Sequence, residues 1–195
     1  AFGPVLNDLD NTRVSGGSSG GSAVAVQAGL CMATLGSETG GSIRQPASFT
    51  GTIGFKPTYG RLSRYGLIAF ASSFDQIGPI TNTVEDMALM MEAMAGQDPH
   101  DATSSPEPVS HYSEHLDAPK KLRIAYYPQT LDNPKIDPEI SAAMYGLIDK
   151  LRADGHVVES CDLKYLDYLV PTYYVLTTAE ASSNLSRFSG IHYGF

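Results

Sequence analysis

Two glycine-rich turns that carry serines are the part of this sequence best suited to chemistry. The first is GGSSGG at residues 16–21, and the second is TGGS at residues 39–42. A serine hydroxyl becomes a nucleophile when a base takes its proton, and glycine lets backbone N–H groups come close to a developing oxyanion. The residues of the two turns leave three interpretations open.

The first interpretation is a nucleophile elbow, because the first turn fits G-x-S-x-G around Ser18 and again around Ser19. An elbow follows a buried strand, and the preceding LDNTRVS is a poor one. A base is also missing nearby, since the histidines all follow the glycine-rich region and none stands in an obvious catalytic loop. They are His100, His111, His115, His156 and His192. These features disfavour an α/β-hydrolase.

The second interpretation is a phosphate-binding loop, because amides at a helix N-terminus attract anions. A Walker motif requires Gly-Lys-Ser/Thr, whereas here Gly21 is followed by Ser22. Lys56 is the only lysine before residue 120. A nucleotide site is therefore weakly supported.

The third interpretation uses both turns together. Ser42 would be the nucleophile, and Ser18 would relay a proton between Ser42 and a base. The oxyanion would be bound by successive amides of the second turn, around Thr39, Gly40 and Gly41.

The segments around these turns predict the elements that must position them. Residues 22–34 (SAVAVQAGLCMAT) are apolar and rich in alanine, which predicts a buried helix. Residues 35–80 are rich in turn residues and β-formers, which predicts short strands joined by functional loops. The spacing of Thr83 and Asp86 is that of a capping box, so a helix should follow and end at Gly96.

A βαβ unit is predicted in the second half of the chain. Residues 122–127 (LRIAYY) and residues 156–160 (HVVES) are strand candidates. Between them, Asp137 and Pro138 start an amphipathic helix, and Gly155 ends it. The two strands should be parallel, with a right-handed crossover.

Together these elements predict an α/β fold with a central mixed or mostly parallel sheet flanked by helices. The glycine-rich turns should converge at one edge of that sheet. Because the chain starts and stops abruptly, we expect a single domain over residues 1–195 that is incomplete at both ends.

Composition restricts the classes of function. The chain has 13 Lys and Arg against 21 Asp and Glu, a net charge of −8, which is the wrong sign for gripping nucleic acid. Cys31 and Cys161 are far apart and lack neighbouring metal ligands, which disfavours a disulfide framework and a zinc site. No apolar run is long enough for a membrane span, and no signal peptide is recognisable. These features predict a cytoplasmic protein with no bound metal and no membrane association.

The long motifs around the two turns resemble the amidase signature family. GGSSGGSAVAVQAGL is followed by LGSETGGSIRQPASFTGTIGFKPTYGRLSRYGL, as in that family. FASSFDQIGPITNTVEDMALMMEAMAG and AEASSNLSRFSGIHYG are most similar to its branch of A subunits of tRNA-dependent amidotransferases. The resemblance covers essentially the whole chain and implies the α/β amidase-signature fold. It also implies hydrolysis of carboxamides by a Ser–cis-Ser–Lys triad.

The resemblance assigns roles to residues of both turns. Ser42 matches the nucleophile that forms the acyl-enzyme, and Ser18 matches the proton relay that follows a cis peptide bond, here Gly17–Ser18. The triad lysine belongs upstream of the glycine-rich region, and nothing here corresponds to it. Lys56, in GFKPTYGR, does not occupy its position. This chain by itself is therefore expected to be inactive.

Further residues are assigned by the same resemblance. Tyr173 matches an aromatic hydroxyl that approaches the bound amino acid, although a purely structural tyrosine is equally consistent with the sequence. Arg44 and Gln45 are expected to brace the loop rather than touch substrate. Glu38 stands where the family usually has Asp, which keeps the charge and adds a methylene.

The resemblance implies a glutaminase that works within an assembly. It would release ammonia from glutamine and pass it to a B subunit, which uses ATP and Mg²⁺ to activate a misacylated tRNA. A small C subunit would clamp the pair, and this chain would bind no cofactor itself. Two alternatives stay open: a stand-alone amidase of the same family, and a non-catalytic binding module that uses the glycine turns structurally.

Overall fold

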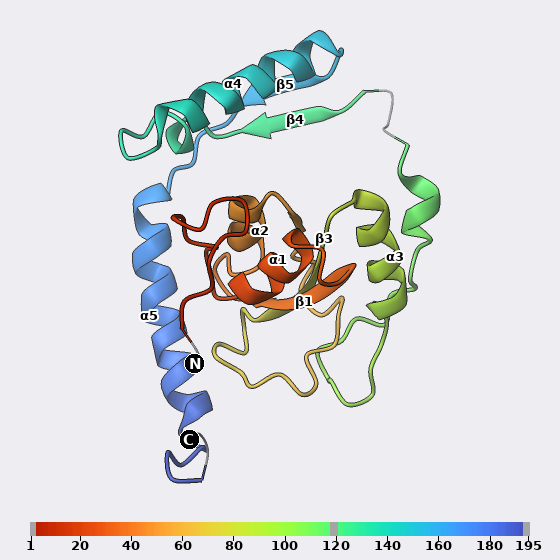
Figure 1. Ribbon diagram of the computed structural model, residues 1–195, viewed down its shortest axis with the longest axis vertical. Helices are drawn as coiled ribbons and strands as arrows, with labels where there is room; N and C mark the ends of the chain where they lie inside the picture. The colour runs from red at the N-terminus through yellow and green to blue at the C-terminus, as the bar shows by residue number, and fades with distance from the viewer. Residues whose placement is uncertain (1–2, 118–120, 193–195) are drawn as a thin grey trace. The chain divides into compact units, whose positions relative to one another are not determined.

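The computed structural model describes residues 3–117 and 121–192 of the chain. These residues form two compact units, one made of residues up to Leu116 and from Tyr174 onward, the other of Asp117–Tyr173 (Figure 1). None of the helices within the described ranges is both long and apolar enough to cross a membrane.

The first unit is built on a three-stranded antiparallel sheet in the order β1-β3-β2. Its strands are β1 (Ala33–Glu38), β2 (Ile53–Gly54) and β3 (Gln76–Thr81). The full length of β1 pairs with β3, and the short β2 pairs with the end of β3. β1 is therefore an edge strand of this sheet, and the second glycine turn follows directly after it.

Helices α1 (Gly20–Gln27), α2 (Arg44–Thr50) and α3 (Val84–Met94) contact this sheet. The core between α1, α2 and the sheet is small and apolar, and α3 adds buried methionines and an alanine of its own. The core cluster consists of Ala23, Val26, Ile43, Ala47 and Ile80.

Glycines on all three strands let the start of α2 lie directly on the sheet. Ile43 is fully buried at this point. A Cβ at Gly36 of β1 would lie 2.9 Å from Cγ1 of Ile43. A Cβ at Gly54 of β2 would lie 2.8 Å from the carbonyl oxygen of Ile43. A Cβ at Gly78 of β3 would lie 3.0 Å from Cδ1 of Ile43 and 2.0 Å from the carbonyl oxygen of Phe55. Larger residues at these strand positions would push Ile43, and the turn before it, off the sheet.

The helix expected over residues 22–34 is wrong in its second half. Helix α1 ends at Gln27, and β1 begins at Ala33. Gly29 has φ of 69°, and the N–H groups of Gly29 and Leu30 donate to carbonyls of the last helical turn. This Schellman arrangement stops the helix although the apolar run continues.

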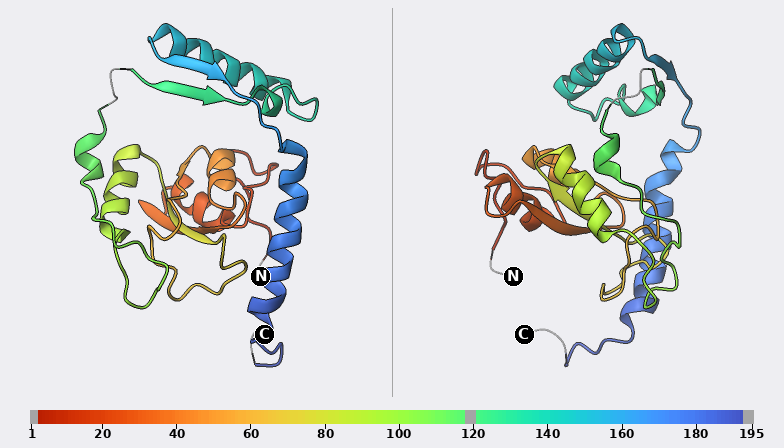
Figure 2. Two further views of the ribbon diagram at one scale, coloured as in Figure 1. Left: turned by 180° about the vertical axis from the view of Figure 1, so that it is seen from behind. Right: turned by 90° about the vertical axis from the view of Figure 1, so that its right-hand side faces the viewer.

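The expectation of strands and loops alone over residues 35–80 is also wrong, because α2 lies within it. Helix α5 (Leu166–Leu185) was not predicted either, and it contains Pro171. The course of α5 is visible from two further sides in Figure 2. Two short 3-10 helices, η1 (Tyr112–His115) and η2 (Pro128–Thr130), complete the helical elements of the described residues.

The elements predicted from local signals are confirmed. The Thr83 side chain accepts from the Asp86 N–H at the start of α3. In the second unit, β4 (Arg123–Tyr126) and β5 (Val157–Ser160) pair in parallel, and α4 (Pro138–Ala153) lies between them in the chain. The helix begins as expected, with the Asp137 carboxylate accepting from the Glu139 N–H, and stops before Gly155, whose φ is 90°.

The predicted α/β class is confirmed, with one correction to its sheet. The three-stranded sheet is antiparallel rather than mostly parallel, and the parallel pairing is confined to β4 and β5 among the described residues. In this sheet β3 lies between β1 and β2 and runs antiparallel to both. The prediction of one domain over residues 1–195 stays a prediction.

Replacing Gly78 tests the packing of α2 on the sheet. Gly78→Ala should lower the free energy of unfolding by about 1–3 kcal/mol or more, because the new methyl group collides with the carbonyl oxygen of Phe55. Gly146→Ala is the matched control, since it lies inside α4 and its Cβ would meet nothing within 4 Å. That variant should be more stable than the wild type by about 0.4–1 kcal/mol. Urea unfolding of the two variants checks both signs, and equal effects would contradict the packing argument.

Candidate active site

The second glycine turn connects the end of β1 to the start of α2. Ser42 immediately precedes Ile43, the N-cap residue of α2, and is partly buried. Among the described residues, no hydrogen bond is formed by the backbone N–H groups of the turn. These groups belong to Thr39, Gly40, Gly41 and Ser42. The turn therefore presents a serine hydroxyl beside free amide donors, the combination that can bind an oxyanion.

A buried carboxylate fixes the far end of this turn. Glu38 is 1% exposed, and its Oε2 accepts from the N–H groups of Ile43 and Arg44, each at 3.0 Å. Its Oε1 accepts from Arg44 Nε at 2.6 Å and also pairs with Arg44 Nη2. Burial acts to raise the pKa of Glu38, but the hydrogen bonds from the Arg44 side chain and from both N–H groups outweigh it and lower the pKa.

The same carboxylate explains why α2 was missed. Its N-cap residue is Ile43, which has no side-chain acceptor, so the sequence shows no start signal. Glu38 supplies the missing acceptor from the preceding strand, and a carboxylate at a helix N-terminus is favourable. The helix begins where it does because of a residue outside it.

The first turn is held against the second. The Gly17–Ser18 peptide bond is cis, as the resemblance implied. The Gly17 N–H donates to Gln45 Oε1 at 3.0 Å, and the Ser19 N–H donates to the carbonyl oxygen of Ser42 at 3.1 Å. The residues on either side of Ser18 are thus anchored, Gly17 to α2 and Ser19 to Ser42.

The bracing roles expected for Arg44 and Gln45 agree with these contacts. Arg44 binds the carboxylate of Glu38, and Gln45 binds the backbone of the first turn. Both side chains therefore tie α2 to neighbouring segments, Arg44 to the end of β1 and Gln45 to the first turn.

The two serines of the first turn differ in their surroundings. Ser19 is buried, and its Oγ both donates to the carbonyl oxygen and accepts from the N–H of Ser37 on β1, at 3.2 Å each. Ser18 is exposed. Within the described ranges, no hydrogen bond involves Oγ of Ser18 or Oγ of Ser42. The hydroxyl of Ser19 is thus engaged in structure, whereas the other two are available for chemistry.

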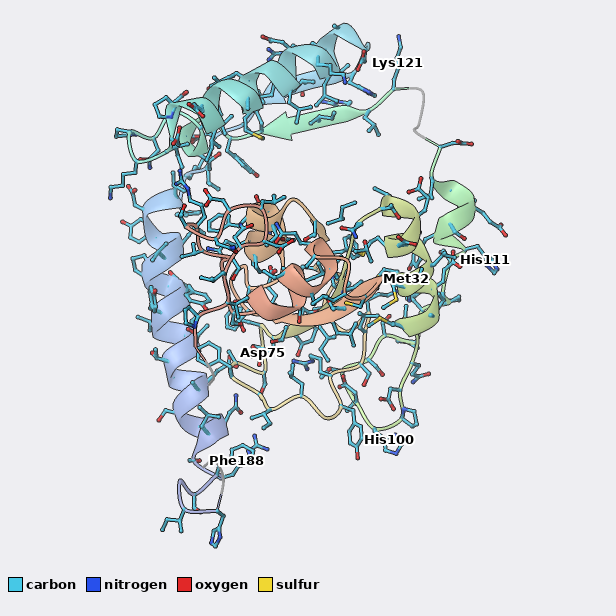
Figure 3. All side chains as sticks on the ribbon, in the orientation of Figure 1. Met32, Asp75, His100, His111, Lys121 and Phe188 are labelled. Atoms are coloured by element: carbon cyan, nitrogen blue, oxygen red, sulfur yellow. The ribbon has the colours of Figure 1, made fainter. Side chains whose placement is uncertain are left out.

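Other candidates lie outside this arrangement. Lys56 Nζ donates to the carbonyl oxygen of Pro57 at 2.9 Å. Tyr173 belongs to α5 in the second unit, and its contact with substrate stays a prediction. His100 and His111 are exposed and point away from the sheet in Figure 3, which weakens the elbow interpretation further. No group of metal-ligating side chains occurs in the part of the chain that is described.

Asp75 is a residue of the site that the sequence interpretation missed. Thr39 Oγ1 donates to Asp75 Oδ1 at 2.6 Å, so the side chain of Asp75 contacts the first residue of the turn. Asp75 is 4% exposed and lies directly before β3 (labelled in Figure 3). The available signal was one carboxylate inside the otherwise uncharged run FASSFDQIGPI.

Comparison with known proteins agrees with this geometry. The family model described as Amidase matches residues 1–195. The chain is 55% identical to the A subunit of glutamyl-tRNA(Gln) amidotransferase from Acidobacterium capsulatum, over 100% of this chain and 41% of that protein. It is 53% identical to the protein of the same name from Campylobacter fetus subsp. fetus, over 99% of this chain and 42% of that one.

Solved structures are similar as well. The crystal structure of the glutamyl-tRNA(Gln) amidotransferase A subunit from Thermotoga maritima matches with a TM-score of 0.84 and 45% identity, over 98% of this chain and 42% of that one. Native peptide amidase from Stenotrophomonas maltophilia matches with a TM-score of 0.78 and 34% identity, over 96% and 39%. The chain spans about two fifths of the length of these relatives.

Neutralising Glu38 tests the anchor of the turn. Glu38→Gln should lower the free energy of unfolding by about 1–3 kcal/mol at neutral pH, because an amide NH₂ then faces N–H donors. Since folding lowers the pKa of Glu38 from its ordinary 4.5, the carboxylate stabilises the fold above that pH, and the benefit is lost as the pH falls through the folded value. The difference between wild type and variant should therefore be constant above pH 4.5 and shrink below it. Urea unfolding from neutral to acid pH measures the difference.

The exposed Glu107 supplies a control for that series. Glu107→Gln should change the free energy of unfolding by less than about 0.5 kcal/mol at any of these pH values. A Glu38→Gln effect as small as this one, or one that grows toward acid pH, would contradict the assignment of Glu38 as the anchor.

Proposed function

The chain belongs to the amidase family, and we propose that its protein is the glutaminase subunit of a tRNA-dependent amidotransferase. The observation that carries the proposal is the junction of the two turns, where the Ser19 N–H donates to the Ser42 carbonyl oxygen and the Gly17 N–H donates to Gln45. The names of relatives more than half identical to this chain support the choice of substrate and assembly.

In the proposed reaction Ser42 is the nucleophile. Its Oγ attacks the side-chain carbonyl carbon of glutamine, and Ser18 takes the hydroxyl proton and passes it to the triad lysine that the family carries upstream. The oxyanion is bound by the free N–H groups of Thr39, Gly40 and Gly41. The C–N bond breaks as the proton reaches the leaving nitrogen, which releases ammonia and leaves a γ-glutamyl ester on Ser42. Water then cleaves the ester to glutamate by the same steps in reverse order.

The ammonia is proposed to serve a partner. A B subunit would use ATP and Mg²⁺ to activate glutamate on tRNA(Gln) or aspartate on tRNA(Asn), and a C subunit would clamp the A and B subunits together. This chain would bind neither ATP nor a metal. Its net charge of −8 supports the idea that the B subunit holds most of the tRNA. A cytoplasmic location, expected from the two widely separated cysteines, is part of the same proposal.

A stand-alone amidase is the second candidate. The similarity to peptide amidase favours it, because the two proteins share the fold of this region. Such an enzyme would use the same serines on another small amide. Tyr173 is retained as a candidate substrate contact for either function.

Removing the nucleophile tests the proposed chemistry. In the full-length protein with its partner subunits, Ser42→Ala should reduce the release of ammonia from glutamine by at least about 10³-fold, because no other group can form the ester. Ser110→Ala, at an exposed position, is the matched control and should keep the wild-type rate. Wild-type protein that ignores glutamine but cleaves other amides would be a stand-alone amidase. Wild-type protein that cleaves no amide would contradict catalysis altogether.

The origin of the base can be tested in the same assay. Lys56→Ala should leave the rate within about twofold of wild type, because Nζ of Lys56 binds a backbone carbonyl instead of a catalytic serine. Residues 1–195 alone should release no ammonia above the Ser42→Ala level, since the serine then has no base. A loss in Lys56→Ala as large as that in Ser42→Ala would instead identify Lys56 as the base.

A further inference from the structure

Asp75 is connected on one side to the proposed oxyanion-binding turn and on the other side to a loop. Its Oδ1 accepts from Thr39 Oγ1 at 2.6 Å, a short charge-assisted bond. Its Oδ2 accepts from the N–H groups of Phe70 and Ala71, at 2.8 and 2.9 Å. The buried carboxylate thus links the loop of residues 70–75 to the first residue of the turn.

The same loop is fastened to the part of α5 that belongs to the first unit. Glu180 Oε2 accepts from the Ser73 N–H at 3.0 Å, and this bond, together with one from the Ser73 side chain, lowers the pKa of Glu180. Asn184 Nδ2 donates to the carbonyl oxygen of Phe70 at 3.2 Å, and Asn184 Oδ1 accepts from Ser72 Oγ at 3.2 Å. Glu180 and Asn184 lie within AEASSNLSRF, the segment whose role the proposed chemistry leaves unused.

We propose that Asp75 is a positioning residue for the oxyanion-binding turn, presented to Thr39 by a loop that Glu180 and Asn184 hold against α5. The inference rests on the proposed function, because it assigns the turn a role in amide hydrolysis. It adds a second anchor to the one already described. Glu38 fixes the turn where it enters α2, and Asp75 fixes it where it leaves β1.

Two anchors are needed because the turn between them is made of glycines and free amides. Gly40 and Gly41 bring no side chain that could pack, and their N–H groups form no hydrogen bonds among the described residues. The direction of these N–H groups is then set by the residues at either end. Loss of the Thr39–Asp75 bond should leave the binding of substrate nearly unchanged and misdirect N–H donors that act in the transition state.

A double-mutant cycle tests this role in the full-length protein with its partner subunits. Thr39→Val removes the hydroxyl, and Asp75→Asn replaces the charged acceptor. Each should lower kcat for glutamine hydrolysis about tenfold and leave KM within about twofold, as expected for an interaction that matters only in the transition state. The double variant should be no slower than either single one, because both remove the same bond. Thr39→Ser, which keeps the hydroxyl, should restore kcat to within about threefold of wild type.

A matched control separates positioning from general stability. Thr12 Oγ1 donates to Asp10 Oδ1 at 2.6 Å in an exposed loop, so Thr12→Val removes a bond of the same kind away from the turn. It should leave kcat unchanged. Additive losses in the cycle, a rise in KM alone, or no rescue by Thr39→Ser would overturn the proposal.

The outcome stays decisive if glutamine is the wrong substrate. The oxyanion-binding turn serves any amide, so the cycle would be repeated on whichever carboxamide the wild type cleaves. If the wild type cleaves none, the proposed function fails, and crystal structures of the full-length wild type and Asp75→Asn decide the positioning claim. A displaced Thr39 backbone in the variant supports it, and an unchanged turn overturns it.

Discussion

The buried carboxylate of Glu38 is the interaction on which the arrangement of this site depends. It ends β1, starts α2 and binds Arg44, so a single side chain determines how the TGGS turn crosses from sheet to helix. A carboxylate with so little exposure would be costly without partners, and its two backbone N–H donors and the Arg44 guanidinium compensate for that cost. Ser42 lies in the turn between β1 and α2, the two elements that Glu38 connects.

The packing beneath the turn imposes a second constraint, which acts through volume rather than charge. Ile43 follows Ser42 and is fully buried against positions where each strand has a glycine. The side chain fills the space that three absent methyl groups leave, so α2 approaches the sheet more closely than ordinary strands would permit. Hydrogen bonds to Glu38 fix where α2 starts, and the packing of Ile43 fixes how closely α2 approaches the sheet. The two effects together hold the proposed nucleophile on a rigid support.

The sequence was informative where a signal and its effect lie within one turn of each other. Thr83 begins α3, and Asp137 and Gly155 bound α4, because each acts on backbone a few positions away. Prediction failed where a hydrogen-bond partner is remote in the sequence, or where a stop signal competes with a helix-favouring composition. Helix α2 depends on an acceptor outside itself, and α1 ends at Gln27, just before the positive-φ Gly29, inside a run whose alanines favour continuation. The link from Asp75 to Thr39 spans 36 positions and left no periodic pattern.

The motif resemblance singled out Ser18 and Ser42 among several serines, which periodicity could not do. The structure adds a physical reason for that choice. Ser19 is an N-cap residue by position, yet its hydroxyl binds β1 instead of the helix amides. The Gly17 N–H is taken by Gln45, and the Ser42 carbonyl is taken by the Ser19 N–H. Each of these bonds uses a group next to a proposed catalytic hydroxyl and leaves that hydroxyl unbound. Rigid neighbours around free hydroxyls are what a proton relay between two serines requires, because the donor and acceptor must stay aligned without being satisfied by the protein itself.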